Sequence, residues 1–347
     1  MHAVIAGASG AIGSALAREL ASTTGVRVTG IARNAPQVAT ANVQYLQADL
    51  TDIDACQRAL HGLPSVTHLY YCGRASHAEQ QIEDVATNVL MLTNILEVLE
   101  PQGLAHVHLV QGGKVYGVHV GPFPTPARES DARAPIENFN YAHEDILRER
   151  SHDAGWTWSA SRPHTLAHYS PTIARNLVSS LGAYAALCKA LGSAFDFPGP
   201  ASAYESLTQV TCTSLLARAI VWMSTTGACA NEAFNINNGD AFRWSQIWPR
   251  LAQSFGLPCG TVRPMRLAEV MADRERTWQQ VVTQAGLKPV ALTQIANWSY
   301  LDGNFERSWD ELFSTNKARQ FGFHEWLDSE AQLLGLITQY RDARLLP

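Results

Sequence analysis

A glycine-rich segment near the start of the chain has the residue types and spacing of a phosphate-binding turn. Residues 7–13 read Gly-Ala-Ser-Gly-Ala-Ile-Gly and follow the apolar run Val-Ile-Ala at residues 4–6. Gly7 and Gly10 allow the backbone to turn tightly and approach a pyrophosphate, and Gly13 allows a helix to pack closely on a strand. The helix that follows would direct free N–H groups and its positive dipole end at the phosphates. Because a strand is expected before the turn and a helix after it, the segment predicts a dinucleotide site.

The residues after the second expected strand indicate which dinucleotide binds. A carboxylate there would hold the ribose 2′-hydroxyl of NAD, whereas an arginine suits the 2′-phosphate of NADP. The chain has Arg33 and Asn34 at this place and no carboxylate, and a guanidinium can bind phosphate oxygens through two hydrogen bonds. We therefore expect NADPH/NADP⁺ as the cofactor, with Asp49, next to Leu50, accepting from the adenine amino group. The alternatives are a solvated surface arginine and an aspartate that caps a turn.

These residues require a scaffold of alternating strands and helices. Apolar runs predict strands at residues 4–6, 26–31, 43–46, 66–72 and 107–111, and helical spacing of apolar residues marks residues 12–20 and 86–99. Such alternation is typical of βαβ units, and the right-handed crossover rule then makes a doubly wound parallel sheet the expected arrangement. We predict an α/β protein with a Rossmann-type sheet and a smaller, mostly helical C-terminal substrate domain.

The second half of the chain is less regular and sets the expected domain limits. Further strands are expected at residues 158–162 and 233–237, separated by helical patterns rich in Trp, Tyr and Phe, most of which we expect in the core. We predict an NADP-binding domain over residues 1–162, to which residues 208–240 return, and a substrate-binding or lid portion over residues 163–207 and 241–347.

Composition excludes several classes of protein. The 347 residues are 46% hydrophobic, which is enough for a core, and 26 Lys+Arg against 31 Asp+Glu leave a net charge of −5 without a basic run. This argues against nucleic-acid binding. No apolar stretch approaches the ~18–20 residues of a membrane span, and the residues that lead into the first expected strand lack the basic region and cleavage site typical of a signal peptide. The six cysteines lie far apart without metal-ligand spacing, so we expect reduced thiols, no metal and a cytoplasmic location.

Several motifs give the chain a resemblance to a known family. It resembles the extended short-chain dehydrogenases/reductases and, among them, the progesterone 5β-reductase/iridoid synthase-like enone reductases. The resemblance extends over essentially the whole chain, and the blocks around Lys114 and Tyr141 are its most specific part. The motifs are residues 7–13, Ala-Arg at 32–33, Gln-Ala-Asp-Leu at 47–50, Gly-Lys-Val-Tyr at 113–116, Gly-Pro-Phe at 121–123, Asn-Phe-Asn-Tyr at 138–141, Glu-Asp-Ile-Leu at 144–147, Ser-Arg-Pro at 161–163 and residues 231–240.

A tyrosine and a lysine form the catalytic pair that the resemblance implies. Most short-chain dehydrogenases carry a lysine four positions after the tyrosine on one helix face, but here Asp145 follows Tyr141 at that offset and Val120 follows Tyr116. Any such pair must therefore form in space. Lys114 precedes Tyr141 by 27 positions, and both are expected at the carboxyl edge of the sheet, where ligands of such folds bind. The resemblance implies that Lys114 and Tyr141 are catalytic.

The implied reaction is the 1,4-reduction of an enone by NADPH. Hydride delivery to the β-carbon of an α,β-unsaturated carbonyl places negative charge on the carbonyl oxygen. A phenol aimed at that oxygen would stabilise the enolate, and a nearby ammonium would lower the cost of the charge. The sequence leaves open whether Tyr141 or solvent supplies the proton, and Tyr116 competes with Tyr141 for the donor role.

The chain departs from the family pattern at positions that are expected to line the substrate pocket. Asn140 replaces the first of two consecutive aromatic residues, residues 117–120 resemble a short insertion, and residues 73–75 read Gly-Arg-Ala where many relatives have a tryptophan. We therefore expect a substrate other than a plant steroid or iridoid. Phe123, Asn140 and Phe313 are expected to contact it, and Phe313 lies in a segment that resembles the mobile lid of the family.

Two other functions stay open at this point. One is a carbonyl-reducing or epimerase/dehydratase-type extended short-chain dehydrogenase, and the other is an NADPH-sensing regulator without turnover. A small-molecule enone is the expected partner, together with a second copy of the chain in a homodimer. The residues expected to contact the cofactor are Gly7, Ser9, Gly10, Ala11, Ile12, Gly13, Arg33, Asn34, Asp49, Leu50, Gln111, Lys114, Tyr141 and Pro163.

Overall fold

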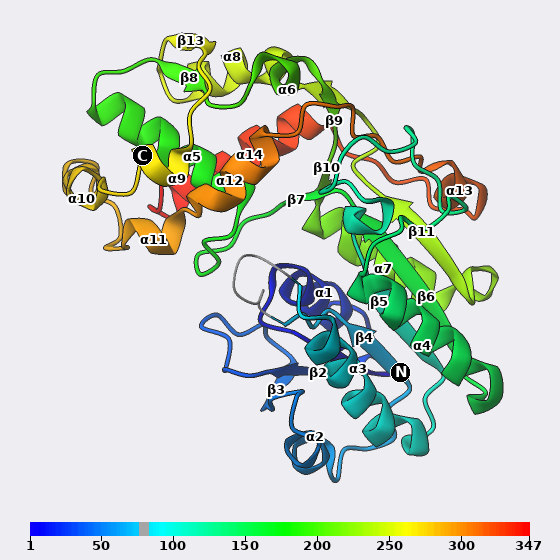
Figure 1. Ribbon diagram of the computed structural model, residues 1–347. Helices are drawn as coiled ribbons and strands as arrows, with labels where there is room; N and C mark the ends of the chain where they lie inside the picture. The colour runs from blue at the N-terminus through cyan, green and yellow to red at the C-terminus, as the bar shows by residue number, and fades with distance from the viewer. Residues whose placement is uncertain (76–82) are drawn as a thin grey trace.

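A seven-stranded parallel sheet forms the centre of the molecule (Figure 1). The computed structural model describes residues 1–75 and 83–347. The strand order is β11-β6-β5-β4-β1-β2-β3, and all neighbours in this sheet run parallel. The expected doubly wound sheet is thereby confirmed. Its strands are β1 (His2–Ala6), β2 (Arg27–Ala32), β3 (Val43–Gln47), β4 (His68–Tyr71), β5 (His106–Val110), β6 (Thr157–Pro163) and β11 (Glu232–Ile236).

Helices cover both faces of the sheet because its strands are apolar on both sides. In β1, Val4 and Ala6 face one hydrophobic cluster, whereas Ala3 and Ile5 face the other, as the period-two alternation of a strand requires. The first face is covered by α2 (Ile53–Leu60), α3 (Val85–Leu99) and α4 (Phe139–Ala154), and the second by α1 (Ala11–Ala21) and α7 (Thr213–Thr225).

A second lobe, mostly helical, is built from the later part of the chain (Figure 1). Its core is rich in aromatic rings, as expected: Trp248 stacks on Phe195 with ring centroids 4.3 Å apart. Short strand pairs join its segments: β7 (Thr165–Ala167) with β10 (Val210–Cys212), β8 (Phe195–Phe197) with β13 (Cys259–Val262), and β9 (Leu207–Thr208) with β12 (Phe242–Arg243). Its helices are α5 (Leu177–Ala190), α6 (Ala201–Glu205), α8 (Trp244–Ser254), α9 (Leu267–Val270), α10 (Glu275–Gln284), α11 (Leu292–Ile295), α12 (Trp298–Phe305) and α14 (Ser329–Asp342).

One C-terminal helix lies with the sheet and not with this lobe. Helix α13 (Asn316–Gln320) packs beside β11 (Figure 1). The Lys317 ammonium lies 4.9 Å from the centre of the Phe234 ring and donates to Glu232 at 2.6 Å, while Ala318 joins the hydrophobic cluster on that face of the sheet. The expected lid portion over residues 241–347 is therefore too long at this point, because α13 covers the last strand of the sheet.

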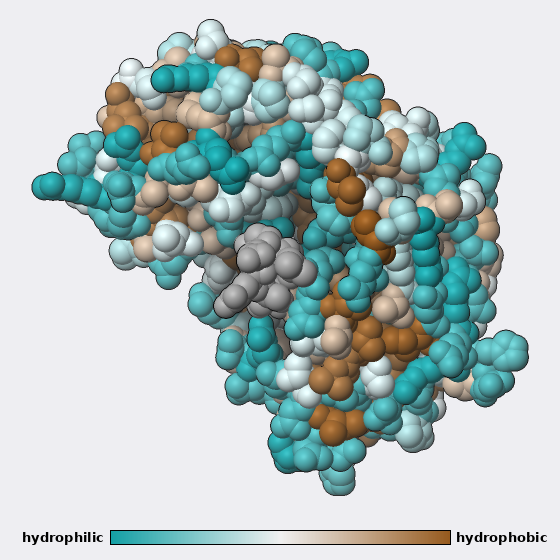
Figure 2. Space-filling view, in the orientation of Figure 1, coloured by the Kyte–Doolittle hydropathy of each residue, from teal (hydrophilic) through white to brown (hydrophobic). Residues whose placement is uncertain are grey.

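The surface is hollowed between the two lobes (Figure 2). All six cysteines are unpaired. Among the residues that the structure describes, every helix is too short or too polar to span a lipid bilayer.

A buried row of polar side chains joins β5 to β6. The two ring nitrogens of His106 hydrogen-bond to Thr157 Oγ1 and Ser159 Oγ, both at 2.8 Å. His108 continues the row to Ser159 Oγ at 2.8 Å and Ser161 Oγ at 3.1 Å. Burial lowers the pKa of His106 to about 3 and takes the pKa of His108 well below 6.5. Both rings are therefore neutral in the folded protein at pH 5, whereas the unfolded chain would protonate them.

We expect this row to make stability depend on pH. The folded-state pKa lies below the unfolded value of 6.5. The free energy of unfolding therefore does not depend on these histidines above pH 6.5, and it decreases as the pH falls below 6.5, because only the unfolded chain takes up the protons. Each buried histidine should cost up to about 2 kcal/mol of unfolding free energy at pH 5. Urea unfolding at pH 7.5 and 5.0 measures the loss. His106→Gln should shrink the difference between the two pH values, and replacing the exposed His152 by Gln should not. An unchanged difference in His106→Gln would contradict the assignment.

Candidate active site

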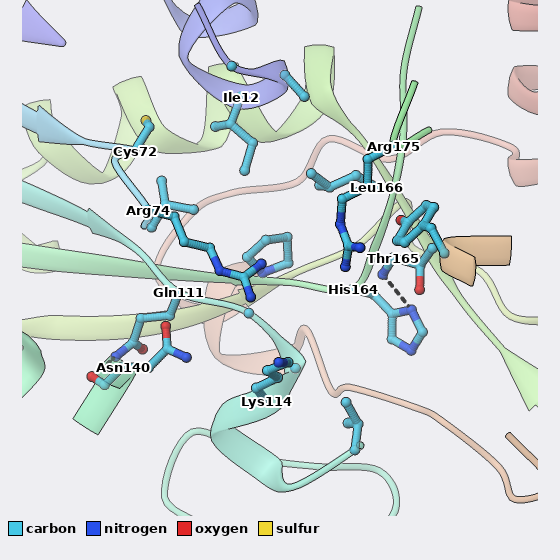
Figure 3. A pocket seen from close by; sticks show the side chains of 18 of the residues that line it. Ile12, Cys72, Arg74, Gln111, Lys114, Asn140, His164, Thr165, Leu166 and Arg175 are labelled. Carbon is cyan, nitrogen blue, oxygen red and sulfur yellow. Dashed lines mark hydrogen bonds between the residues drawn. The ribbon is translucent and has the colours of Figure 1, made fainter. Parts of the chain in front are cut away.

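A cleft of about 360 Å³ opens at the carboxyl edge of the sheet (Figure 3). Its walls come from the segments that follow β1, β4, β5 and β6, which meet because parallel strands end at one edge, and from residues of the second lobe. The main lining residues are Gly10, Ala11, Ile12, Gly13, Cys72, Gly73, Arg74, Glu83, Gln111, Gly113, Lys114, Phe139, Asn140, Pro163, His164, Arg175, Tyr300, Arg307 and Phe313.

The glycine-rich turn has the shape that a pyrophosphate requires. Gly7 has a φ of +80°, and a Cβ atom there would lie 2.8 Å from the carbonyl oxygen of Cys72. A Cβ on Gly13 would collide with the carbonyl oxygen of Gly7. Gly10 is the N-cap of α1 and offers no side chain to the first turn, so the N–H groups there are free to bind an anion. The turn therefore fits a dinucleotide.

The residues expected at the adenosine end lie at the ends of β2 and β3. Arg33 and Asn34 are exposed beyond β2, and Ser9 and Asn34 line a second groove beside the cleft. Asp49 is exposed, but its carboxylate accepts from Thr51 N at 2.9 Å and from Thr51 Oγ1 at 2.8 Å, which lowers its pKa. Asp49 thus caps a turn, which was one of the alternatives. Leu50 is buried.

Lys114 reaches the cleft from the turn after β5. It lies in a short 3₁₀ helix, η3 (Gly113–Tyr116), and its Nζ atom donates to Glu83 Oε1 at 2.7 Å. Arg74 donates to the same oxygen at 2.7 Å. Burial lowers the pKa of Lys114, and the contact with Glu83 opposes this shift. The ammonium is therefore partly desolvated and held in place by a carboxylate.

Tyr141 does not meet Lys114 in this cleft. Its hydroxyl donates to the carbonyl oxygen of Val115 at 2.6 Å and accepts from Ala134 N at 2.9 Å. The Arg133 guanidinium lies 4.9 Å from the centre of its ring, and the residue is 8% exposed. Both hydrogen bonds tie the hydroxyl to backbone groups, and Tyr141 is not among the residues that line the cleft. Its expected role at the substrate and cofactor stays a prediction.

Asn140 faces the cleft in place of the tyrosine (Figure 3). Successive helix residues point about 100° apart, so Asn140 and Tyr141 at the start of α4 cannot face the same way. Asn140 Nδ2 donates to Asn138 Oδ1 at 2.8 Å. An amide nitrogen carries two hydrogens, and within the described part of the chain only one of them has a partner, so the other could bind a ligand. Asn138 caps α4 and also donates to the carbonyl oxygen of Lys114 at 2.8 Å, which couples the helix start to the lysine turn.

Tyr116, the other phenol considered, also lies outside the cleft lining. Its hydroxyl donates to Asn235 Oδ1 at 2.6 Å and accepts from Arg162 at 3.2 Å. Burial raises the pKa of Tyr116 to about 12. The hydroxyl therefore belongs to a hydrogen-bond network around Arg162.

This network surrounds a buried ion pair. Arg162 in β6 binds Glu144 in α4 at 3.0 Å, with side chains 7% and 5% exposed. Gln111 lines the cleft but is committed to the same network: its Oε1 accepts from Arg162 at 2.9 Å, and its Nε2 donates to Glu144 and to the carbonyl oxygen of Asn140, both at 3.0 Å. Burial by itself would raise the pKa of Glu144, but the charge of Arg162 and the hydrogen bonds from Arg148 and Gln111 outweigh it and lower the pKa.

Of the expected substrate contacts, Asn140 and Phe313 line the cleft, whereas Phe123 is not among its lining residues. The Phe313 ring packs against Tyr116 with ring centroids 5.1 Å apart, and the Phe123 and Phe313 ring centroids are 6.1 Å apart. The backbone of Phe313 is held by Gln209 Oε1 at 2.8 Å and Asn237 Nδ2 at 2.9 Å. Phe313 is thus a fixed wall in this structure.

Several cleft residues were not identified from the sequence. Glu83, Arg175, Tyr300 and Arg307 belong to no motif, and only their position after folding reveals them. Arg74 lies in the segment 73–75 that was expected to line the substrate pocket, and it does line the cleft, as does His164. His164 Nδ1 accepts from Thr165 N at 2.8 Å (Figure 3), so its proton lies on Nε2, and burial lowers the pKa of the ring to about 3. The ring is therefore neutral near pH 7.

Known proteins are similar to the chain over its whole length. Residues 3–163 match the model of the NAD dependent epimerase/dehydratase family. The chain is 31% identical to the short chain dehydrogenase gsfE of Penicillium aethiopicum, with 99% of both chains covered. It is 32% identical to the (S)-8-oxocitronellyl enol synthase of Catharanthus roseus and to the 3-oxo-Delta(4,5)-steroid 5-beta-reductase of Arabidopsis thaliana, covering 99% of this chain and 92% and 93% of theirs. The UDP-glucose 4-epimerase of Thermotoga maritima has the same fold, with a TM-score of 0.70 at 17% identity and 99% of both chains covered.

The ion pair behind the cleft should be essential for stability. Glu144→Gln leaves the Arg162 charge buried without a carboxylate partner, so we expect a loss of about 3 kcal/mol in the free energy of unfolding. Asp145→Asn is the matched control, because Asp145 is exposed and binds Arg133 at the surface; its cost should stay below about 1 kcal/mol. Chemical denaturation at pH 7.5 measures both. Equal losses of unfolding free energy in the two variants would show that the buried ion pair contributes no more to stability than the exposed one.

Proposed function

The chain belongs to the progesterone 5β-reductase/iridoid synthase-like family of oxidoreductases, within the short-chain dehydrogenases/reductases, and on that premise we propose that it is an NADPH-dependent enone 1,4-reductase. The observation that carries the proposal is the position of Lys114. Its ammonium, bound to Glu83 at 2.7 Å, lines one cleft together with the first turn of α1 and with Pro163. This position supports the proposal, because a positively charged hydrogen-bond donor then lies in the cleft that dinucleotide and substrate would share.

The cofactor is proposed on the fit of the glycine turn and on the arginine beyond β2. NADPH, when bound, supplies the hydride for the β-carbon of the enone. The α1 N-terminus would bind its pyrophosphate, and Arg33 would bind its 2′-phosphate, because the guanidinium is exposed there.

We assign the stabilisation of the enolate to Lys114 and Asn140. An ammonium that is already partly desolvated interacts strongly with negative charge that develops on a carbonyl oxygen. The remaining N–H of the Asn140 amide would supply a second, uncharged donor in the same cleft. Tyr141 is left out of this assignment because both hydrogen-bonding directions of its hydroxyl are in use. The proton for the α-carbon then comes from solvent, which is one of the two sources considered above.

Two variants separate this assignment from a tyrosine mechanism. Lys114→Met should lower kcat for a small cyclic enone by about 10²–10³, the usual cost of removing one transition-state donor. Tyr141→Phe should keep kcat within a few-fold, while the loss of its two backbone hydrogen bonds lowers the free energy of unfolding by about 1–3 kcal/mol. Stopped-flow oxidation of NADPH, with identification of a saturated carbonyl as the product, is the measurement. If Tyr141→Phe loses as much kcat as Lys114→Met, the Tyr141 hydroxyl takes part in catalysis. An alcohol product would reject 1,4-reduction.

The choice of NADPH over NADH has its own test. Arg33→Gln should raise the KM for NADPH by tenfold or more, because a charged contact to phosphate contributes about 1.5–3 kcal/mol, and should leave the KM for NADH nearly unchanged. Arg27→Gln, at the exposed start of β2, is the matched control. Equal KM values for NADPH in Arg33→Gln and the unchanged protein would refute the role of Arg33.

A further inference from the structure

We propose that the substrate is an enone that carries a carboxylate or a similar anionic group, and that Arg175 binds this group. The proposal rests on the proposed function, since it names the substrate class of the same cleft.

Arg175 lines the cleft, and no carboxylate of the described part of the chain pairs with it. It directly precedes Asn176, the N-cap of α5, and lines the cleft from the second lobe. Its guanidinium lies 4.5 Å from the centre of the Tyr300 ring. Among residues 1–75 and 83–347, it forms no ion pair with a carboxylate. A stacked guanidinium keeps its five donors at the edge of its plane, where an anion can reach them.

The other cations of the cleft share their charge with carboxylates. Lys114 and Arg74 both bind Glu83 Oε1 at 2.7 Å, and Arg307 binds Glu311 at 3.1 Å. Among the residues that the structure describes, Arg175 thus differs from these three cations in having no carboxylate within ion-pair distance. Burial, together with the charges of Arg74 and Arg307, lowers the pKa of Arg175. An anionic ligand would relieve this repulsion, whereas a neutral ligand would not.

The direction of the side chains gives the site two ends. Figure 3 shows Arg74, Lys114 and Arg175 extending from three different segments toward one open space, with Asn140 beside Gln111. A conjugated carbonyl placed against Lys114 and Asn140 would leave the rest of the molecule within the region of Arg175. The hydride acceptor and the anion are then recognised by different residues, so Arg175 acts on affinity and orientation and not on the chemical step.

One other anion could occupy this region, namely the pyrophosphate of the cofactor. The first turn of α1 offers its own free N–H groups for that group, and Arg175 comes from the lobe opposite that turn. We therefore assign Arg175 to the substrate, and the experiment below separates the two sources of negative charge.

The test uses a matched pair of enones, 3-(3-oxocyclohex-1-en-1-yl)propanoate and its methyl ester, in which two methylene groups separate the carboxylate or ester from the reacting double bond. It is carried out with the 347-residue chain and NADPH. For the unchanged protein we expect kcat/KM to be at least tenfold higher for the carboxylate. Arg175→Met should lower kcat/KM for the carboxylate by 10- to 100-fold through KM, the range that a charged hydrogen bond provides, and change it less than threefold for the ester. Arg175→Lys should restore part of the loss. Arg263→Met, an exposed arginine outside the cleft lining, is the control and should change neither.

The remaining outcomes each overturn a defined part of the proposal. A rise in the NADPH Kd of Arg175→Met, measured by fluorescence titration, assigns the guanidinium to the cofactor phosphates. If Arg175→Met loses the same factor in kcat/KM for both substrates, Arg175 has only a structural role through its contact with Tyr300. If the unchanged protein has equal kcat/KM values for the acid and the ester, the proposal of an anionic substrate is rejected. If neither enone is reduced, the proposed function fails. Calorimetric binding of the carboxylate and the ester in the presence of NADP⁺ then tests the anion site independently, and equal affinities in the unchanged protein and Arg175→Met reject it.

Discussion

The rotational setting of helix α4 is the constraint on which the cleft depends. Three contacts determine it: the Asn138 cap, which also binds the carbonyl oxygen of Lys114, the hydrogen bond from Tyr141 to Val115, and the buried pair between Glu144 and Arg162. They lie on successive turns and tie the helix to η3 and to β6. Turning α4 about its axis by one residue would break all three and leave a buried guanidinium unpaired, at a cost of several kcal/mol.

Because of this setting, the cleft presents an amide and an ammonium where a phenol was expected. Asn140 and Lys114 belong to different segments, but the carbonyl oxygen of Lys114 and the side-chain oxygen of Asn138 connect them within two hydrogen bonds. The polar groups behind them have their partners in the network around Arg162. This arrangement is preorganised, because the donors are held before a ligand arrives and need little reorganisation when charge develops.

The two lobes contribute different chemistry to the cleft. The sheet supplies the glycine turn, Lys114 and Asn140, all at the carboxyl ends of parallel strands, where backbone N–H groups and polar side chains naturally gather. The second lobe supplies Arg175, Tyr300 and Arg307, which surround the place where the remainder of a substrate would lie. Substrate choice could therefore change through the second lobe without disturbing Lys114 and Asn140, the donors that we propose for the carbonyl.

Local sequence patterns were enough to predict the sheet, its helices and the glycine turn, because strand alternation, helical spacing and the need for Gly7 and Gly13 act between residues close in the chain. Lys114 could be placed at the carboxyl edge for the same reason. The direction of Tyr141 could not be predicted, since neighbouring helix residues differ by about 100° and distant contacts to Val115 and Arg162 select the face. The position of α13 and the surroundings of Arg175 likewise depend on contacts between residues far apart in the chain, such as Lys317 with Glu232 and Arg175 with Tyr300, and no short motif records such contacts.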